Sequence, residues 1–137
     1  MKTGTDFEEH IYRLVNNSPI RGLITGKVYL GGLRPVNSKL EDAVISYQTG
    51  LSDQIQTGNV NVNIFVPDIV HVDDNGAKSS IKNFQRCRLI ELACQNFISS
   101  QIANEYRLSL VTTIQTFSHE AEQHFINMRI RYRYTSF

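Results

Sequence analysis

The chain has 137 residues, which suits one domain and is too short for two independent cores. Fourteen Lys and Arg residues against thirteen Asp and Glu residues give a net charge of +1, which excludes a grossly basic nucleic-acid binder but not a local basic patch. No apolar run approaches the ~20 residues of a membrane span, and the N-terminus lacks the apolar stretch of a signal peptide. We therefore expect a soluble, intracellular, single-domain protein.

The first part of the chain predicts a helix, a short strand and a loop. A helix is expected over Thr5–Asn17, because Thr5 and Glu8 fit a capping box and apolar residues then recur at helical spacing. A short strand is expected over Lys27–Leu30. The next segment, 31–42, combines two glycines, a proline and polar residues, so we expect it to project and to contact a neighbouring subunit. A mobile surface loop is the alternative.

The middle of the chain predicts two strands and a long helix. Ala43–Thr49 is rich in β-branched and aromatic residues. Asn59–Val66, which follows a polar connection, alternates apolar residues with mostly asparagine, as expected for a strand with one buried face. Ser80–Ala103 predicts a helix whose wide apolar face suits packing across a sheet. Its cysteines, Cys87 and Cys94, are expected to be buried thiols, because two helical turns hold them ~10 Å apart, beyond disulfide reach.

Two further strands, Tyr106–Phe117 and Phe125–Tyr134, are predicted to close the chain as a long hairpin. The predicted order is helix, strand, strand, strand, helix, strand, strand. The fold class expected from this order is α+β, with a single, mainly antiparallel sheet of about four to five strands packed by two helices. The predicted core residues are Phe7, Ile11, Val60, Val62, Ile64, Ile90, Cys94 and Phe97.

Three motifs that resemble metal or phosphate sites are incomplete. His119 and His124 are five residues apart, where a helical zinc site needs four. A calcium loop that starts in the predicted turn at Asp73 would have Phe84 where a bidentate glutamate is needed. The segment 22–28 is one residue too short for a phosphate loop, and valine replaces its magnesium-binding Ser or Thr. We therefore expect no catalytic residue, metal or cofactor.

Charge is distributed unevenly along the chain. Segment 36–76 contains one basic residue, Lys39, whereas its acidic residues are Glu41, Asp42, Asp53, Asp68, Asp73 and Asp74. A basic group follows at Lys78, Lys82 and Arg86, which would share one face of a helix that began early enough. Acidic and basic segments on one small domain suit head-to-tail association into a ring.

A second basic group, Arg129, Arg131 and Arg133, alternates with apolar residues near the C-terminus, so all three arginines would lie on one face of a strand. One interpretation is a solvated face. The other is a contact stripe, either for the acidic segment of the next subunit or for DNA phosphates, which need no specific base. We favour the protein contact, because a net charge of +1 is low for a dedicated DNA binder.

The order and length of these segments resemble a known family. The residues that carry the resemblance are Lys27–Leu30, Leu33–Ser38, Glu41–Tyr47 and Gly58–Pro67, followed by the second helix and the closing hairpin. The chain looks like the small tail terminator proteins of long-tailed bacteriophages, which are also called tail-completion or neck proteins.

This resemblance implies a structural role without catalytic residues. Members of the family form a ring, commonly a hexamer, that caps the finished tail tube and joins it to the head connector. The implied partners are further copies of the chain, the tail tube protein, the connector protein and DNA that passes through the channel without sequence-specific binding. The implied location is the neck of the virion, after assembly in the host cytoplasm.

Two other functional classes remain open from the sequence. One is a small non-enzymatic adaptor or ligand-binding domain from a prophage or mobile element, and the weaker one is an enzyme. The candidate subunit or partner contacts are Arg34, Asn37, Lys78, Lys82, Arg86, Arg129, Arg131 and Arg133.

Overall fold

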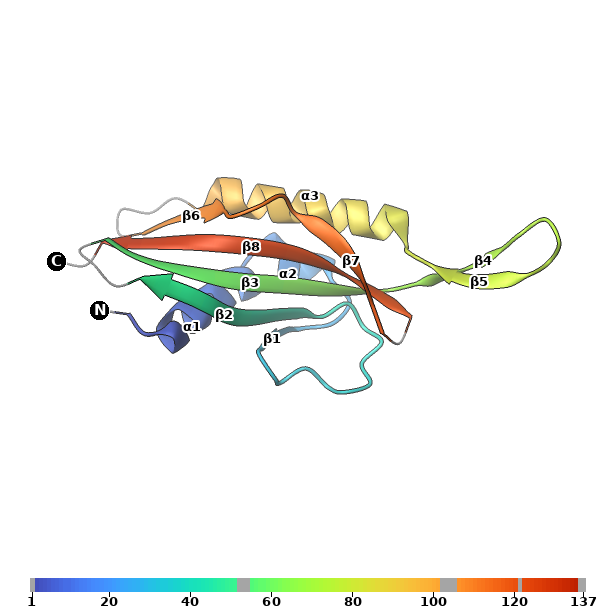
Figure 1. The fold of residues 1–137 in the computed structure, drawn as a ribbon, viewed down its shortest axis with the longest axis horizontal. Helices are drawn as coiled ribbons and strands as arrows, with labels where there is room; N and C mark the ends of the chain where they lie inside the picture. Colours follow the sequence, from blue (N-terminus) through green and yellow to red (C-terminus); the bar gives the residue numbers. More distant parts are fainter. Residues whose placement is uncertain (1, 52–54, 102–105, 121, 136–137) are drawn as a thin grey trace.

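A computed structural model describes residues 2–51, 55–101, 106–120 and 122–135 (Figure 1). Its centre is a six-stranded sheet with the strand order β1-β2-β3-β8-β6, in which β7 also pairs with β8. These strands are β1 (Val28–Leu30), β2 (Ala43–Leu51), β3 (Ile55–Pro67), β6 (Tyr106–Leu110), β7 (Gln115–His119) and β8 (Gln123–Thr135). The pairing is antiparallel except between β1 and β2, which run parallel.

Three helices and a second, two-stranded sheet complete the described part of the chain. The helices are α1 (Gly4–Asn16), α2 (Pro19–Leu23) and α3 (Phe84–Ser100), and the second sheet pairs β4 (Ile69–Val72) with β5 (Lys78–Ile81). We call this hairpin, residues 69–81, the arm. Figure 1 shows the arm extending from one end of the body, while the last residues of β8 lie at the opposite end.

The predicted single sheet of four to five strands with two helices is wrong, because the fold is a mixed α/β arrangement with more strands and one more helix. Residues 80 and 81, the start of the predicted helix Ser80–Ala103, belong to β5 and pair with β4 instead, so α3 begins only at Phe84, capped by the Asn83 side chain. The predicted strand Tyr106–Phe117 divides into β6 and β7, which pair with successive parts of β8. The predicted end of the long helix at Ala103 lies outside the described residues.

Helix α1 shows how local sequence positions an apolar face. Its capping box is formed by Thr3 and Asp6 rather than by Thr5 and Glu8, since Thr3 Oγ1 accepts a hydrogen bond from the Asp6 N–H at 3.2 Å and Asp6 Oδ2 accepts one from the Thr3 N–H at 2.8 Å. The N-cap therefore lies two residues earlier than predicted, and the helix begins at Gly4. Its buried residues are Phe7, Ile11 and Val15.

The core lies between the helices and one face of the large sheet. Cross-strand pairs on β3 and β8, such as Val60 with Ile130 and Ile64 with Ile126, are fully buried. The eight predicted core residues are all buried, so that prediction is confirmed. Alternation along β3 and β8 sends asparagines and arginines to the other face, on which none of the described helices packs. We call this polar surface the open face of the sheet.

Candidate assembly interface

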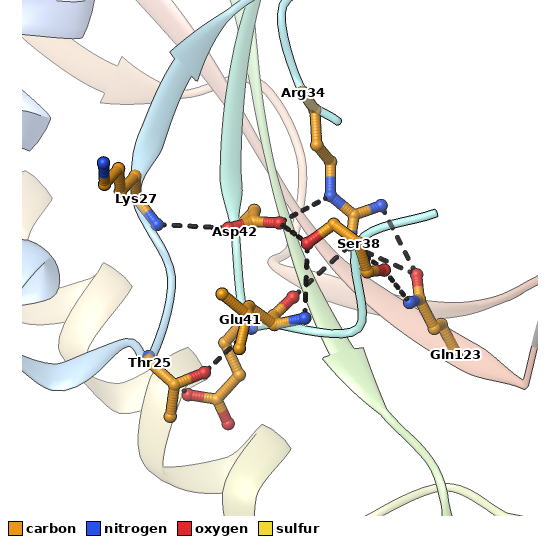
Figure 2. Close-up of polar contacts among 8 residues, drawn as sticks. Thr25, Lys27, Arg34, Ser38, Glu41, Asp42 and Gln123 are labelled. Atoms are coloured by element: carbon orange, nitrogen blue, oxygen red, sulfur yellow. Dashed lines mark hydrogen bonds and ion pairs between the residues drawn. The ribbon is translucent and has the colours of Figure 1, made fainter. Parts of the chain in front are cut away.

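Loop 31–42 is tied to the body by a buried carboxylate (Figure 2). Asp42, immediately before β2, is 0% exposed. Its carboxylate accepts hydrogen bonds from Arg34 Nε at 2.9 Å, from Ser38 Oγ at 2.5 Å and from the Lys27 backbone N–H at 3.1 Å. Gln123 of β8 donates from Nε2 to the Ser38 carbonyl at 2.7 Å. The loop is therefore bonded to both β2 and β8 instead of hanging freely from the sheet.

Close backbone packing at Gly26 completes this anchor. The Gly26 N–H donates to the Glu41 carbonyl at 2.8 Å. A Cβ atom at this position would overlap the Asp42 carboxylate and would lie 2.6 Å from the Glu41 carbonyl oxygen. The glycine in segment 22–28 thus permits a close approach of two backbone segments.

A second buried carboxylate, Glu41, ties the start of α3 to β2. Arg86 donates to it from Nε and from Nη2, each at 2.6 Å, and Nη2 also donates to the Leu23 carbonyl at 2.5 Å. The hydrogen bond to Glu41 raises the pKa of the Arg86 guanidinium above its usual value, although burial acts in the opposite direction. Thr25 Oγ1 accepts from the Glu41 N–H at 2.9 Å. These bonds join three segments that are distant in sequence.

Some of the predicted contact residues form ion pairs within the chain, whereas others lie on the surface. Arg34 pairs with Asp42 and Arg86 pairs with Glu41, so both guanidinium groups stabilise the fold of their own chain. Asn37 is exposed on the loop. Lys78 lies on β5 and Lys82 precedes α3, with its Nζ 4.6 Å from the centre of the Phe84 ring. The predicted helical face shared by Lys78, Lys82 and Arg86 is wrong, because the helix does not include the two lysines.

Most of the acidic segment is also engaged internally. Besides Glu41 and Asp42, Asp68 is paired, its Oδ1 lying 2.6 Å from His124 Nδ1. Asp53 lies outside the described residues. Within the described part of segment 36–76, the carboxylates without a basic partner are those of Asp73 and Asp74, at the tip of the arm. Within this segment, the exposed acidic charge is therefore concentrated at the tip of the arm.

Large apolar side chains are exposed on loop 31–42 and on the arm, and also at Leu51 of β2, at Phe84, Leu89 and Leu92 of α3 and at Phe117 of β7. Loop 31–42 exposes Leu33, Val36 and Leu40. Val36 is 93% exposed although Arg34 and Ser38, two residues away on either side, donate to Asp42. The arm exposes Ile69, Val70 and Val72. The sequence predicted a contact with a neighbouring subunit for loop 31–42 but gave no role to its apolar side chains, because apolar residues in a loop have no periodicity. It did not indicate the arm, because residues 73–76 were assigned to a turn and residues 80 and 81 to a helix. Their only signal is that these residues are apolar where the neighbouring residues are polar.

The open face of the sheet carries the predicted arginine stripe. Arg129, Arg131 and Arg133 point away from the helices, between buried Met128, Ile130 and Tyr132, which confirms the predicted common face. Arg107 of β6, which the sequence analysis did not single out, lies beside Arg133 in the register. Arg129 Nε donates to Asn61 Oδ1 at 3.2 Å. Among the described residues, none of these four arginines forms an ion pair with a carboxylate.

The open face is hollowed beside this stripe. We call the depression at the Arg131 end the arginine hollow. Its lining residues are Thr49, Gly50, Leu51, Thr57, Asn59, Arg131 and Arg133. Leu51 is 74% exposed there, so the hollow combines an uncovered apolar side chain with two guanidinium groups.

The histidines and cysteines that the sequence offered for chemistry make packing contacts or an ion pair instead. His119 packs against phenylalanine rings, and His124 binds Asp68. Cys87 and Cys94 are buried free thiols, as predicted, and burial raises the pKa of both, to about 12 for Cys94, so the nucleophilic thiolate is disfavoured. Across residues 2–51, 55–101, 106–120 and 122–135 there is no group of three or more His, Cys, Asp or Glu side chains placed to hold a metal.

In the same described ranges, no helix is both long and apolar enough to span a membrane. Comparison of the chain with protein-family models and with curated proteins finds no match. Function is therefore inferred from the surfaces of the molecule and from the resemblance in segment order.

Proposed function

We propose that this protein is a structural virion protein, a ring-forming tail terminator of a long-tailed bacteriophage that caps the tail tube and joins it to the head connector. The observation that carries the proposal is that one small domain has three separate surfaces that expose apolar side chains, or charged side chains without an ion-pair partner within the described part of the chain. These are the apolar loop 31–42, the projecting arm and the basic open face of the sheet. A heterologous contact uses two different surfaces of each copy and generates a ring when the rotation closes.

The anchoring of loop 31–42 supports an interface role. An apolar side chain on a mobile loop would lose conformational entropy on binding, whereas one held on a bonded loop is already ordered. The Arg34, Ser38 and Asp42 contacts provide that order, and Val36 lies between the residues that make them. Val36 is therefore a candidate anchor for a neighbouring copy or for the tail tube.

The buried polar side chains already have hydrogen-bond partners within the described part of the chain, which favours assembly over small-molecule binding. Ligand sites are concave and present convergent polar groups to the ligand. In the described part of the protein, every buried side-chain nitrogen or oxygen has a hydrogen-bond partner. The buried carboxylates Glu41 and Asp42 are both occupied by arginine side chains and backbone N–H groups. What remains unsatisfied lies on the surface, where another protein can reach it.

The decisive experiment is negative-stain microscopy of the purified protein at high concentration, with and without tail tubes, together with native mass measurement. The proposal predicts rings, either free or at the ends of tubes. Val36→Asp should prevent ring formation without unfolding the domain, since Val36 makes little contact with its own chain, and Lys39→Asp on the same loop serves as a surface control.

The opposite result would be a monomer in both conditions. If that monomer also melted at a markedly higher temperature with one member of a metabolite library, the protein would be a ligand-binding domain or adaptor, and the terminator proposal would be wrong.

A further inference from the structure

We infer that the tip of the arm of one copy binds in the arginine hollow of the next copy, an inference that rests on the proposed ring. The arm itself indicates a missing partner. All residues of β4 and β5 are exposed except the half-buried Ile81. A two-stranded hairpin is at best marginally stable in water by itself. The arm therefore has an apolar surface and two strand edges for which its own chain provides no cover within the described residues.

The position of the arm requires that the contact be made between copies. The arm follows Pro67, which pairs with Gln123 at the start of β8. Arg131 and Arg133 lie further along β8, roughly 26 to 33 Å away at ~3.3 Å per residue. The arm points away from the body rather than back over the sheet (Figure 1). Its tip therefore cannot reach its own hollow, but a head-to-tail neighbour can present its hollow to it.

The tip and the hollow have complementary chemistry. At the tip, exposed Val72 is followed by Asp73 and Asp74. In the hollow, exposed Leu51 lies with Arg131 and Arg133. Apolar surface can thus meet apolar surface while carboxylates meet guanidinium groups, and arginine binds a carboxylate through two parallel hydrogen bonds.

The tip is ordered for such a contact. Asp73 Oδ1 accepts hydrogen bonds from the N–H groups of Asn75 and Ala77, each at 2.9 Å, and Gly76 occupies the left-handed region with φ 80°. Asp74 is exposed and its carboxylate makes no hydrogen bond or ion pair among the described residues, so it is available to a partner. A turn held in this way loses little conformational freedom when it binds.

Cysteine cross-linking tests the contact in the full chain. A variant with Asp74→Cys and Thr49→Cys, mildly oxidised in the presence of tail tubes, should give a ladder of covalent oligomers that ends at the closed ring. The native Cys87 and Cys94 are buried and should not react. The matched control combines Asp74→Cys with Ser99→Cys, because Ser99 is exposed on α3, on the other side of the sheet from the hollow.

Charge exchange gives an independent readout. Arg131→Glu and Asp74→Lys should each raise the concentration needed for half-assembly, roughly two- to fivefold per interface at low salt and less at high salt. The double variant should recover assembly, because the pair is restored with its signs reversed. Arg88→Glu and Glu9→Lys make the same charge changes at exposed positions outside the hollow and the arm, and should leave assembly unchanged.

The outcomes separate the inference from the proposed function. If the wild-type protein forms rings but the Asp74 and Thr49 pair cross-links no better than the control, the arm contact is refuted while the ring remains. If Arg131→Glu leaves assembly intact and instead reduces retention of DNA in completed particles, the hollow binds phosphate and the inference is wrong. If the wild-type protein forms no ring even with tail tubes, the terminator function fails and the arm contact fails with it.

Discussion

Removal of the Asp42 carboxylate should destabilise the fold more than any surface change. Asp42 is fully buried and accepts three hydrogen bonds, so Asp42→Ala leaves the Lys27 N–H without its partner and the charge of Arg34 without its counter-ion. Breaking a buried ion pair by removing one partner costs about 3–5 kcal/mol. Arg34 is 15% exposed and keeps hydrogen bonds to the Ser38 and Leu40 carbonyls, which places the expected loss near the lower end of that range.

Urea unfolding followed by circular dichroism measures this loss. Asp42→Ala should reduce the free energy of unfolding by about 3 kcal/mol, and Asp42→Asn, which keeps the shape but loses the charge, by about 1–3 kcal/mol. Asp74→Ala, which removes an exposed carboxylate, should change it by less than about 0.5 kcal/mol.

A double-mutant cycle decides whether the Arg34 pair is the cause. Because Asp42→Ala already removes the partner of Arg34, adding Arg34→Ala should cost at least about 1 kcal/mol less than it does in the wild-type protein. If the two losses add to within about 0.5 kcal/mol, or if Asp42→Ala alone costs less than about 1 kcal/mol, the carboxylate does not anchor the loop as argued.

Three further predictions concern the core. Ile64→Ala should cost about 2–5 kcal/mol in urea unfolding, because Ile64 is fully buried at the centre of the sheet, and a loss below about 1 kcal/mol would show that the site repacks. Gly58→Ala should cost about 1–3 kcal/mol, since its Cβ would lie 2.9 Å from Phe7 Cδ2, whereas Gly22→Ala meets no atom within 4 Å and should not destabilise through a clash. The pKa of Cys94 is raised to about 12, so its contribution to stability is complete below about pH 8.5 and is lost as the pH rises toward 12. The wild-type protein should therefore lose up to about 1.4 kcal/mol per pH unit more than Cys94→Ala in alkaline unfolding titrations, and parallel curves would contradict the assignment.

The sequence by itself determined the features that depend on local periodicity. Alternation at Val60, Val62 and Ile64 predicted both the strand and its buried face. The alternation of Arg131 and Arg133 with apolar neighbours predicted that these arginines share one face of a strand. Burial repeats every two residues in a strand, so neighbouring residues are sufficient to reveal it.

Tertiary structure alone decided which charges remain available and where strands end. Glu41 and Arg86 are 45 residues apart in the chain, and nothing around either residue indicates their pairing. Residues 80 and 81 were predicted to begin a helix, yet they belong to β5, which pairs with β4. The acidic segment is a continuous feature of the sequence, yet Asp42 is buried at 0% exposure while Asp74 projects at the tip of the arm. Ion pairing and strand pairing depend on which distant segments the fold brings together, and that information is not present in any short stretch of sequence.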